Sequence, residues 1–142
     1  MDKQPAKPMT EEQVSEDREP TPRGELSLKL IPSRQDTNMH GGISGGWVSA
    51  RMDEAAESVA SRIAQGRVAN VSMDSMVFMS PIRVGAAMCV YTQLEDIGTS
   101  SIKINVEVWT RNLKEQERRK VVDATFIYVA IDEQGRIRNV PR

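Results

Sequence analysis

The apolar residues of this chain change their spacing after Gly46, and this change limits the possible folds more than any other feature of the sequence. Over residues 48–63 they recur at intervals of three and four positions, which is the spacing of one buried helix face. The pattern predicts a helix that runs to about Gln65 and stops at Gly66. The alanines of this face keep it slim, so a sheet is able to approach it closely.

Segments with the two-residue period of β-strands lie on both sides of the predicted helix. Leu26, Leu28 and Leu30 alternate with polar residues and predict a strand that ends at Pro32. The polar, glycine-rich stretch after it predicts a loop. Four further strands are predicted after the helix, at residues 70–79, 86–94, 101–110 and 121–131. This order predicts an α+β fold in which an antiparallel sheet wraps one long helix.

The 142 residues are enough for one domain with a core of its own. Residues 1–23 are charged, contain prolines and offer almost nothing apolar to bury, so we expect a disordered tail there and a folded domain over residues 24–142. Nineteen Lys and Arg against twenty Asp and Glu leave a net charge of −1, which does not favour nucleic acid or an anionic membrane as a partner.

The composition also narrows the chemistry. Cys89 is the only cysteine and His40 the only histidine, which excludes a disulfide framework, a cysteine zinc cluster and a His-rich metal site, so we expect no metal. No apolar stretch approaches the ~20 residues that cross a bilayer, and the N-terminus lacks the apolar core of a signal peptide. The sequence therefore predicts no membrane span and, by default, a cytoplasmic protein.

Two adjacent glycines, Gly45 and Gly46, stand where the predicted helix begins and where backbone N–H groups have no partner within a helix. Glycine lets a ligand carbonyl approach these amides, and the helix dipole adds positive character. Asp53 follows Gly46 by seven residues, about two helical turns, and so projects from the same side as a candidate acid or base. The structural alternatives, a tight turn that needs backbone freedom and a solvent-facing carboxylate, stay open.

The charged run at residues 114–120 also has two interpretations. It is either a solvated hairpin loop between the last two strands or a set of cations, among them Arg118, Arg119 and Lys120, near a ligand phosphate. Neither composition nor spacing decides between them.

Several blocks of the sequence, in the same order, resemble the YciA-type acyl-CoA thioesterases. These blocks read DTN-x-x-G-x-I-x-GGW, GRVANVSMDSMVFMSPIRVGA, GTSSIKINVEVW and ATFIYVAID, and the resemblance covers residues 24–141. It implies the hotdog fold, hydrolysis of acyl-CoA thioesters to a free fatty acid and coenzyme A, and assembly into dimers and trimers of dimers. It implies no separate cofactor, because coenzyme A is part of the substrate and product.

The resemblance also implies roles for single residues. Gly45 and Gly46 match the glycines whose amides line the thioester carbonyl. Arg83 stands three positions after Ser80, which takes the place of a family arginine. The positions that match substrate-binding residues are Asn38, Trp47, Arg83, Thr99, Ser100 and Ser101.

One position departs from the family. Its loop usually reads G-D-I-F-G-G-W, with the aspartate taken to be the catalytic acid, but Gly42 stands there in this chain and is kept only as a substrate-binding position. The sequence favours Asp53 as the carboxylate, because other hotdog thioesterases resemble this chain in placing their acid at that helix position. The second explanation is a catalytically impaired or non-catalytic acyl-CoA binding module, and the third is His40 as general base.

Overall fold

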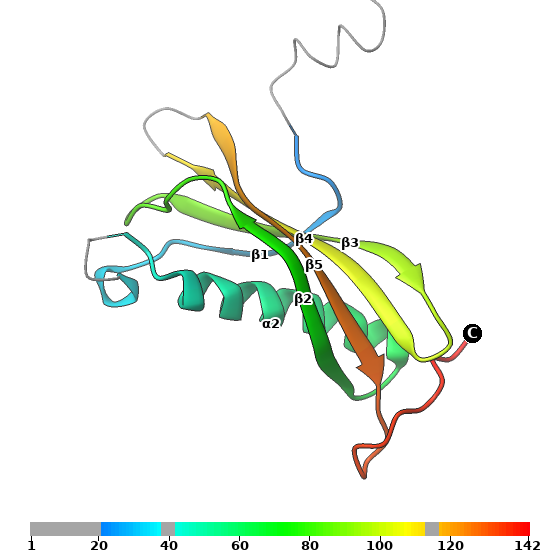
Figure 1. Cartoon of the computed structure of the whole chain (residues 1–142). Coiled ribbons are helices and arrows are strands. Elements are labelled where there is room, and N and C mark those ends of the chain that lie inside the picture. Colours follow the sequence, from blue (N-terminus) through cyan, green and yellow to red (C-terminus); the bar gives the residue numbers. More distant parts are fainter. Residues whose placement is uncertain (1–20, 38–41, 113–116) are drawn as a thin grey trace, which may run out of the picture.

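The computed structural model describes residues 21–37, 42–112 and 117–142, and its centre is the long helix α2 (Gly45–Ala64) (Figure 1). Ser44 caps its N-terminus: the Ser44 hydroxyl oxygen accepts a bond from the Trp47 amide at 3.4 Å. The helix ends at Ala64 because Gln65 adopts a left-handed conformation, with φ of 52°, one residue before the predicted stop at Gly66. No helix within the described ranges is both long and apolar enough to cross a membrane.

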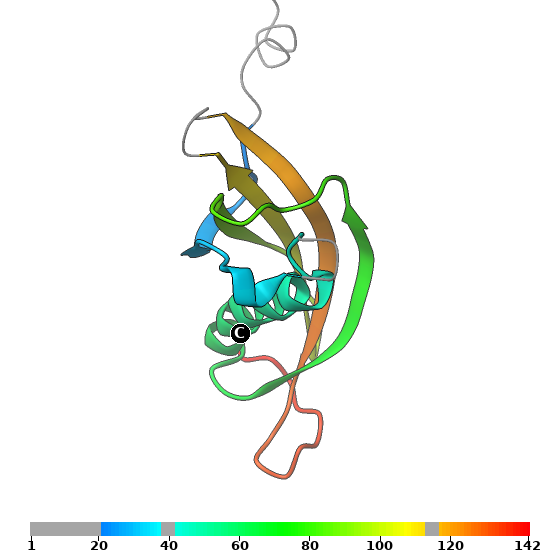
Figure 2. The same ribbon diagram turned by 90° about the vertical axis from the view of Figure 1, so that its left-hand side faces the viewer.

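Five antiparallel strands form one sheet in the order β1-β3-β4-β5-β2, so β1 and β2 are its edges. Their bounds are β1 (Glu25–Leu30), β2 (Val68–Phe78), β3 (Ala87–Ile97), β4 (Ser101–Arg111) and β5 (Arg118–Ala130). A short 3-10 turn, η1 (Arg34–Asp36), follows β1. Turned by 90°, the molecule shows the sheet curving around α2 (Figure 2). The predicted α+β hotdog fold is therefore confirmed.

The core lies between α2 and the concave face of the sheet. The helix contributes mostly small side chains, and the sheet supplies the larger ones, which alternate along the central strands. The buried residues of α2 are Val48, Met52, Ala55, Ala56, Ala60 and Ala64. Those of the central strands include Met88, Val90, Ile102, Ile104, Val106, Val108, Phe126 and Tyr128, each with no exposed surface. This division of sizes confirms the close approach predicted from the alanines.

The last strand begins earlier than predicted, at Arg118 instead of residue 121. Arg118, Arg119 and Lys120 pair with the end of β4, so the hairpin ladder continues into the charged run. The interpretation of this run as a loop is wrong for these three residues, because ladder hydrogen bonds form whatever the side-chain charge. Residues 113–116 lie outside the described ranges.

Residues 1–20 of the predicted tail also lie outside the described ranges. Arg23, the last residue of the predicted tail (residues 1–23), is described and contacts the folded domain. Its amide donates to Glu107 Oε1 at 3.2 Å and its Nε to Glu107 Oε2 at 3.0 Å.

Candidate active site

The start of α2 presents two exposed amides. The Trp47 amide donates to the Ser44 side chain and the Val48 amide to the Ser44 carbonyl at 3.1 Å. Among the described residues, no acceptor takes a bond from the amides of Gly45 and Gly46, which occupy the first two helical positions. These two groups are therefore positioned to donate to an oxygen that is not part of the described chain.

Packing does not explain why both positions are glycine. Neither Gly45 nor Gly46 has a positive φ, so the backbone conformation is open to any residue. A Cβ on Gly45 would lie 3.6 Å from Phe78 Cζ, and one on Gly46 would lie 3.7 Å from the Ser44 hydroxyl oxygen, both ordinary contacts. The interpretation as a tight turn that needs the backbone freedom of glycine therefore has no support at these two positions, and their role at a thioester carbonyl stays a prediction.

Asp53 lies half-buried on α2, and its carboxylate is bonded to the sheet. Its Oδ1 accepts a bond from the Tyr128 hydroxyl at 2.6 Å and a longer one from Asn70 Nδ2 at 3.4 Å. The interpretation of Asp53 as a fully solvent-facing acid does not fit these contacts. The side chain is held at the border between core and solvent.

Gly45, Ser49 and Asp53 form a stripe along α2 at four-residue intervals, and this stripe faces β2. Phe78 lies beside Gly45, and the Ser49 hydroxyl lies 3.4 Å from the Met76 sulfur. Asn70, further back along β2, reaches Asp53. The amides and the carboxylate therefore share one side of the helix, next to the edge strand.

The segment before the helix is fastened to the turn that follows β2. The Ile43 amide donates to the Ile82 carbonyl at 3.1 Å, and both side chains are buried. The Ser44 amide donates to the Asp36 carbonyl at 2.8 Å. Arg83, which is exposed, therefore lies in a turn next to the glycines, and its predicted role in substrate binding stays a prediction.

The other predicted loop residues are placed only in part. Asn38 and His40 lie outside the described residues, so their roles stay predictions. Gly42 lies next to buried Ile43 at the base of the loop. Trp47 packs half-buried against the core, with the Arg51 guanidinium 5.2 Å from the centre of its ring.

Thr99, Ser100 and Ser101 lie at the opposite end of α2 from the glycines. The Ala130 amide donates to the Ser100 carbonyl at 2.9 Å, and the Val140 amide to the Thr99 carbonyl at 2.8 Å. The same C-terminal segment caps the end of the helix, since Arg138 Nη2 donates to the Ala64 carbonyl at 2.9 Å. A 20-residue helix is about 30 Å long, so one chain does not bring this turn to the glycine amides.

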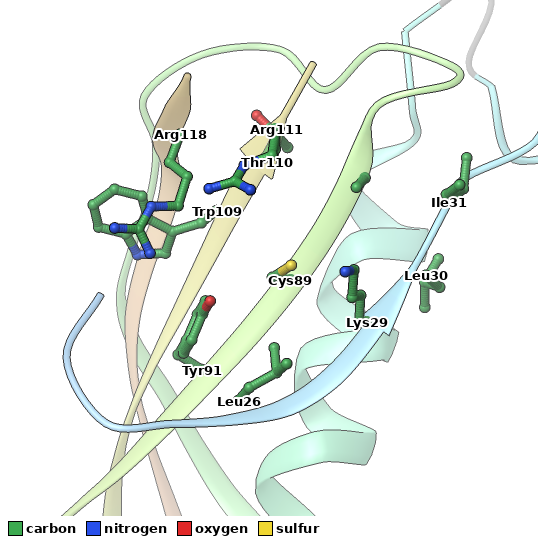
Figure 3. A pocket seen from close by; sticks show the side chains of 11 residues that line it. Leu26, Lys29, Leu30, Ile31, Cys89, Tyr91, Trp109, Thr110, Arg111 and Arg118 are labelled. Atoms are coloured by element: carbon green, nitrogen blue, oxygen red, sulfur yellow. The ribbon is translucent and has the colours of Figure 1, made fainter. Parts of the chain in front are cut away.

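Two of the pockets lined by described residues do not include Gly45, Gly46 or Asp53. The larger, about 650 Å³, opens on the face of the sheet that points away from α2 (Figure 3). Its residues are Leu26, Lys29, Leu30, Ile31, Ala87, Cys89, Tyr91, Trp109, Thr110, Arg111 and Arg118. The smaller, about 350 Å³, lies between β1 and α2. Arg118 brings the charged run to the larger pocket, and its contact with a phosphate stays a prediction.

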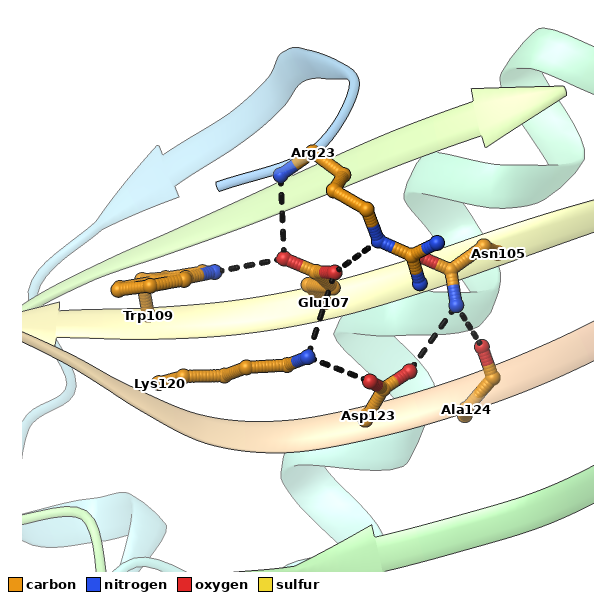
Figure 4. A network of polar contacts seen from close by, with 7 residues as sticks. All are labelled: Arg23, Asn105, Glu107, Trp109, Lys120, Asp123 and Ala124. Carbon is orange, nitrogen blue, oxygen red and sulfur yellow. Dashed lines mark hydrogen bonds and ion pairs between the residues drawn. The ribbon is translucent and has the colours of Figure 1, made fainter. Parts of the chain in front are cut away.

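A polar network covers part of that same outer face (Figure 4). Glu107, only 1% exposed, accepts bonds from Arg23 and from Trp109 Nε1 at 2.9 Å, and Lys120 Nζ lies 3.3 Å from it. Burial alone would raise the pKa of Glu107, but the bonds from Trp109 and Arg23 and the charge of Lys120 outweigh it and hold that pKa below its usual range. This network joins strands and does not reach the glycines.

No group of three or more His, Cys, Asp or Glu side chains suited to a metal ion occurs among the residues that the structure describes. The predicted absence of a cofactor stays a prediction.

Three contributors to the site were missed from the sequence. The cap Ser44 is the first, and serine directly before a helix, a standard cap, was the available signal. Tyr128 and Asn70 gave no local signal, because they lie 75 and 17 positions from Asp53 and meet it only through strand pairing.

The chain is similar in sequence and structure to known thioesterases. Residues 40–116 match the family model of the Thioesterase superfamily. The chain is 41% identical to acyl-CoA thioester hydrolase YciA of Salmonella typhimurium over 124 aligned residues. The alignment covers 85% of this chain and 93% of that protein. An aspartate-to-alanine mutant of a hexameric broad-specificity acyl-coenzyme A thioesterase superposes with a TM-score of 0.82 at 43% identity, over 84% of this chain and 88% of that one. A hexameric thioesterase from Yersinia pestis superposes with a TM-score of 0.81 at 41% sequence identity, over 86% of this chain and 99% of that one.

Proposed function

The chain belongs to the Thioesterase superfamily, among the YciA-type acyl-CoA thioester hydrolases with the hotdog fold, and on this premise we propose that it hydrolyses acyl-CoA thioesters. The products are a free fatty acid and coenzyme A. The observation that carries the proposal is the pair of exposed amides at Gly45 and Gly46, which no described residue uses and which packing does not require to be glycine.

The amides stabilise the charge that develops during the reaction. As water attacks the thioester carbonyl, its oxygen becomes negative and accepts bonds from the Gly45 and Gly46 amides. The helix dipole adds to this stabilisation. When the tetrahedral intermediate collapses, the carbon–sulfur bond breaks and the sulfur leaves as the thiol of coenzyme A.

Asp53 supplies the carboxylate that activates water. It takes a proton from the attacking water, and the same proton is then available to the departing sulfur, so no proton is lost overall. His40 and Gly42 are not needed in this scheme, since the carboxylate comes from the helix and not from the loop.

The two parts of the site on one chain are too far apart to act on one carbonyl. Gly46 and Asp53 are separated by seven residues, about 10 Å along the helix, whereas both must come within about 3 Å of the reacting atoms. We therefore propose that Asp53 of one chain works with the amides of another. The distant turn with Thr99, Ser100 and Ser101 reaches coenzyme A in the same way, from a neighbouring chain.

A homo-oligomer built on β2 meets this requirement. β2 is an edge strand, and Phe78 at its end lies beside Gly45. A second copy that pairs its β2 with this edge therefore lies next to the Gly45 and Gly46 amides. Two similar structures are hexamers, which supports a trimer of such dimers.

The alternative of an acyl-CoA binding module without turnover gains no support. The matched relatives are named as hydrolases, and the carboxylate of Asp53 is present and ordered by hydrogen bonds.

Thiol release from acyl-CoA thioesters of short, medium and long chain length tests the proposal and maps the preferred substrate. We expect rapid release by the unaltered chain. Asp53→Asn should lower kcat by about 100- to 10,000-fold, because general acid–base catalysis contributes that much, while KM changes little. Glu133→Gln, which neutralises an exposed carboxylate outside α2, is the control and should retain full activity.

Two results would contradict the proposal. Absence of thiol release with every thioester would exclude hydrolysis and leave the binding module. Full activity of Asp53→Asn would keep the hydrolysis but remove Asp53 from the mechanism.

A further inference from the structure

Tyr128 and Asn70 are direct partners across the ladder between β5 and β2. Because paired residues project to the same face of a sheet, both side chains point towards α2. Tyr128 has no exposed surface, and its hydroxyl lies 2.6 Å from Asp53 Oδ1 and 3.2 Å from the Asp53 carbonyl oxygen. Strand pairing therefore brings two donors to one carboxylate.

Both donors act on the same oxygen of Asp53. The Tyr128 hydroxyl and Asn70 Nδ2 bond to Oδ1, while no donor among the described residues bonds to Oδ2. Since a carboxylate bonded through one oxygen cannot rotate freely, Oδ2 keeps one direction and remains available to a water molecule.

The Tyr128 hydroxyl remains a donor over the working pH range. Burial raises the pKa of Tyr128, its bond to Asp53 raises it further, and the charges of Asp53 and Glu57 add to this, while a bond with Asn70 lowers it by less. Glu57 is exposed and one helical turn beyond Asp53. The phenol is therefore neutral and able to donate throughout the neutral pH range.

A core position of this kind does not require a hydroxyl. Phe126, two residues earlier on β5, fills the same core layer with a plain ring and is equally buried. Burying a hydroxyl costs free energy unless it is bonded, and here the bond goes to Asp53. The hydroxyl therefore binds Asp53 and is not needed to fill the core.

We propose that Tyr128, with Asn70 as a second donor, is a positioning residue that holds the Asp53 carboxylate in the orientation needed to activate water. The inference rests on the proposed thioester hydrolysis. It assigns Tyr128 no contact with the substrate and no proton transfer of its own.

Tyr128→Phe keeps the ring and removes only the hydroxyl. We expect kcat to fall by about 10- to 100-fold, because the carboxylate loses its alignment, while KM stays within about twofold. The two constants are measured separately, because a loss of alignment lowers kcat and leaves substrate binding intact. Tyr91→Phe is the matched control: it removes the other tyrosine hydroxyl of the chain, on the outer face of the sheet, and should leave both readouts unchanged.

A second variant keeps the inference testable if Tyr128→Phe does not fold. Asn70→Ala, at a half-buried position of the edge strand, should lower kcat by a smaller factor, again with little change in KM, since its bond is longer. Folding is followed by the thermal midpoint and the solution mass of each variant.

The outcomes separate this inference from the function on which it rests. Loss of activity in Asp53→Asn together with unchanged kcat in a folded Tyr128→Phe or Asn70→Ala overturns the positioning role alone. A folded Tyr128→Phe in which KM rises and kcat does not fall also overturns it. Full activity of Asp53→Asn, or no thiol release by the unaltered chain, defeats the proposed function itself.

Discussion

Glu107 is a buried carboxylate that holds the outer face of the sheet together. Three donors surround it, and Lys120 lies 2.5 Å from Asp123 as well, so the charge on Glu107 is compensated from several sides. Removing one member of a buried ion pair leaves the other members without a partner, which costs more than the pair itself contributes.

Glu107→Gln should lower the free energy of unfolding at pH 7 by about 2–3 kcal/mol. The folded-state pKa of Glu107 is below its ordinary 4.5, so its stabilisation is complete above that value and is lost as the pH falls through the lower folded pKa. Urea unfolding at pH 7 and at about pH 3 measures this, and the variant should lose less stability on acidification than the unaltered chain.

Glu133→Gln, at an exposed carboxylate, is the control for this measurement and should behave as the unaltered chain at both pH values. Equal stability of Glu107→Gln and the unaltered chain at pH 7 would show that the network contributes nothing.

The burial of Glu107 could not be predicted from the sequence. Its alternation with Val106 and Val108 correctly predicts that it faces away from α2, and such positions are usually solvated. Arg23, which covers it, lies 84 residues away and belongs to a segment that was expected to be disordered. Contacts at such separation leave no local pattern.

At the scale of the element, α2 combines a slim core face with an open N-terminus. Gly45 and Gly46 are exposed, adopt no positive φ and leave room for a methyl group. Alanine at these positions would therefore favour the stability of the helix, whereas glycine favours the access of a ligand to the amides.

Gly46→Ala should change stability and activity in opposite directions. The free energy of unfolding should rise by about 0.5 kcal/mol, because alanine restricts the unfolded chain at a compatible position. Thiol release should fall by at least about tenfold, because the methyl group displaces the thioester carbonyl. Chemical denaturation and the thiol assay measure the two effects.

Ser58→Ala, at an exposed position further along α2, is the control, since it favours the helix without approaching the amides and should leave thiol release unchanged. Unaltered turnover in Gly46→Ala would show that no carbonyl comes close to this amide.

The helix was the most predictable element. The apolar residues of its core face recur in the sequence at intervals of three and four positions. The observed end of the helix differs from the predicted end by one residue. The bonds of Asp53 were not predictable, because they depend on the register that pairs Asn70 with Tyr128. Local spacing indicates the side of a helix on which a residue lies, but not what it meets there.

At the scale of the whole molecule, one edge of the sheet is apolar and uncovered. Five large apolar side chains in and just after β2 are 41–57% exposed: Val71, Met73, Val77, Phe78 and Met79. An edge strand with such a surface is a site for pairing with another chain.

Replacing Met73 and Val77 together by lysine should prevent this pairing. The solution mass of the unaltered chain should be about six times 15.9 kDa, and the variant should have a lower mass and lose thiol release, with its circular dichroism retained. Light scattering after size exclusion measures the mass.

Ile137→Lys is the matched control, because Ile137 is 66% exposed but lies in the C-terminal segment, where it pairs with Ile131, and not in the apolar stretch of β2. A fully active monomer, in either the unaltered chain or the double variant, would contradict a site shared between chains.

Residues 42–44 and the turn at residues 80–86 are fastened to each other. The Ile43 amide is bonded to the Ile82 carbonyl, and both isoleucines are buried in the same core. Any displacement of Ile43 therefore breaks this hydrogen bond or moves the turn after β2 with it. Withdrawing the two isoleucines from the core would expose apolar surface to water, so these side chains anchor the entrance to α2.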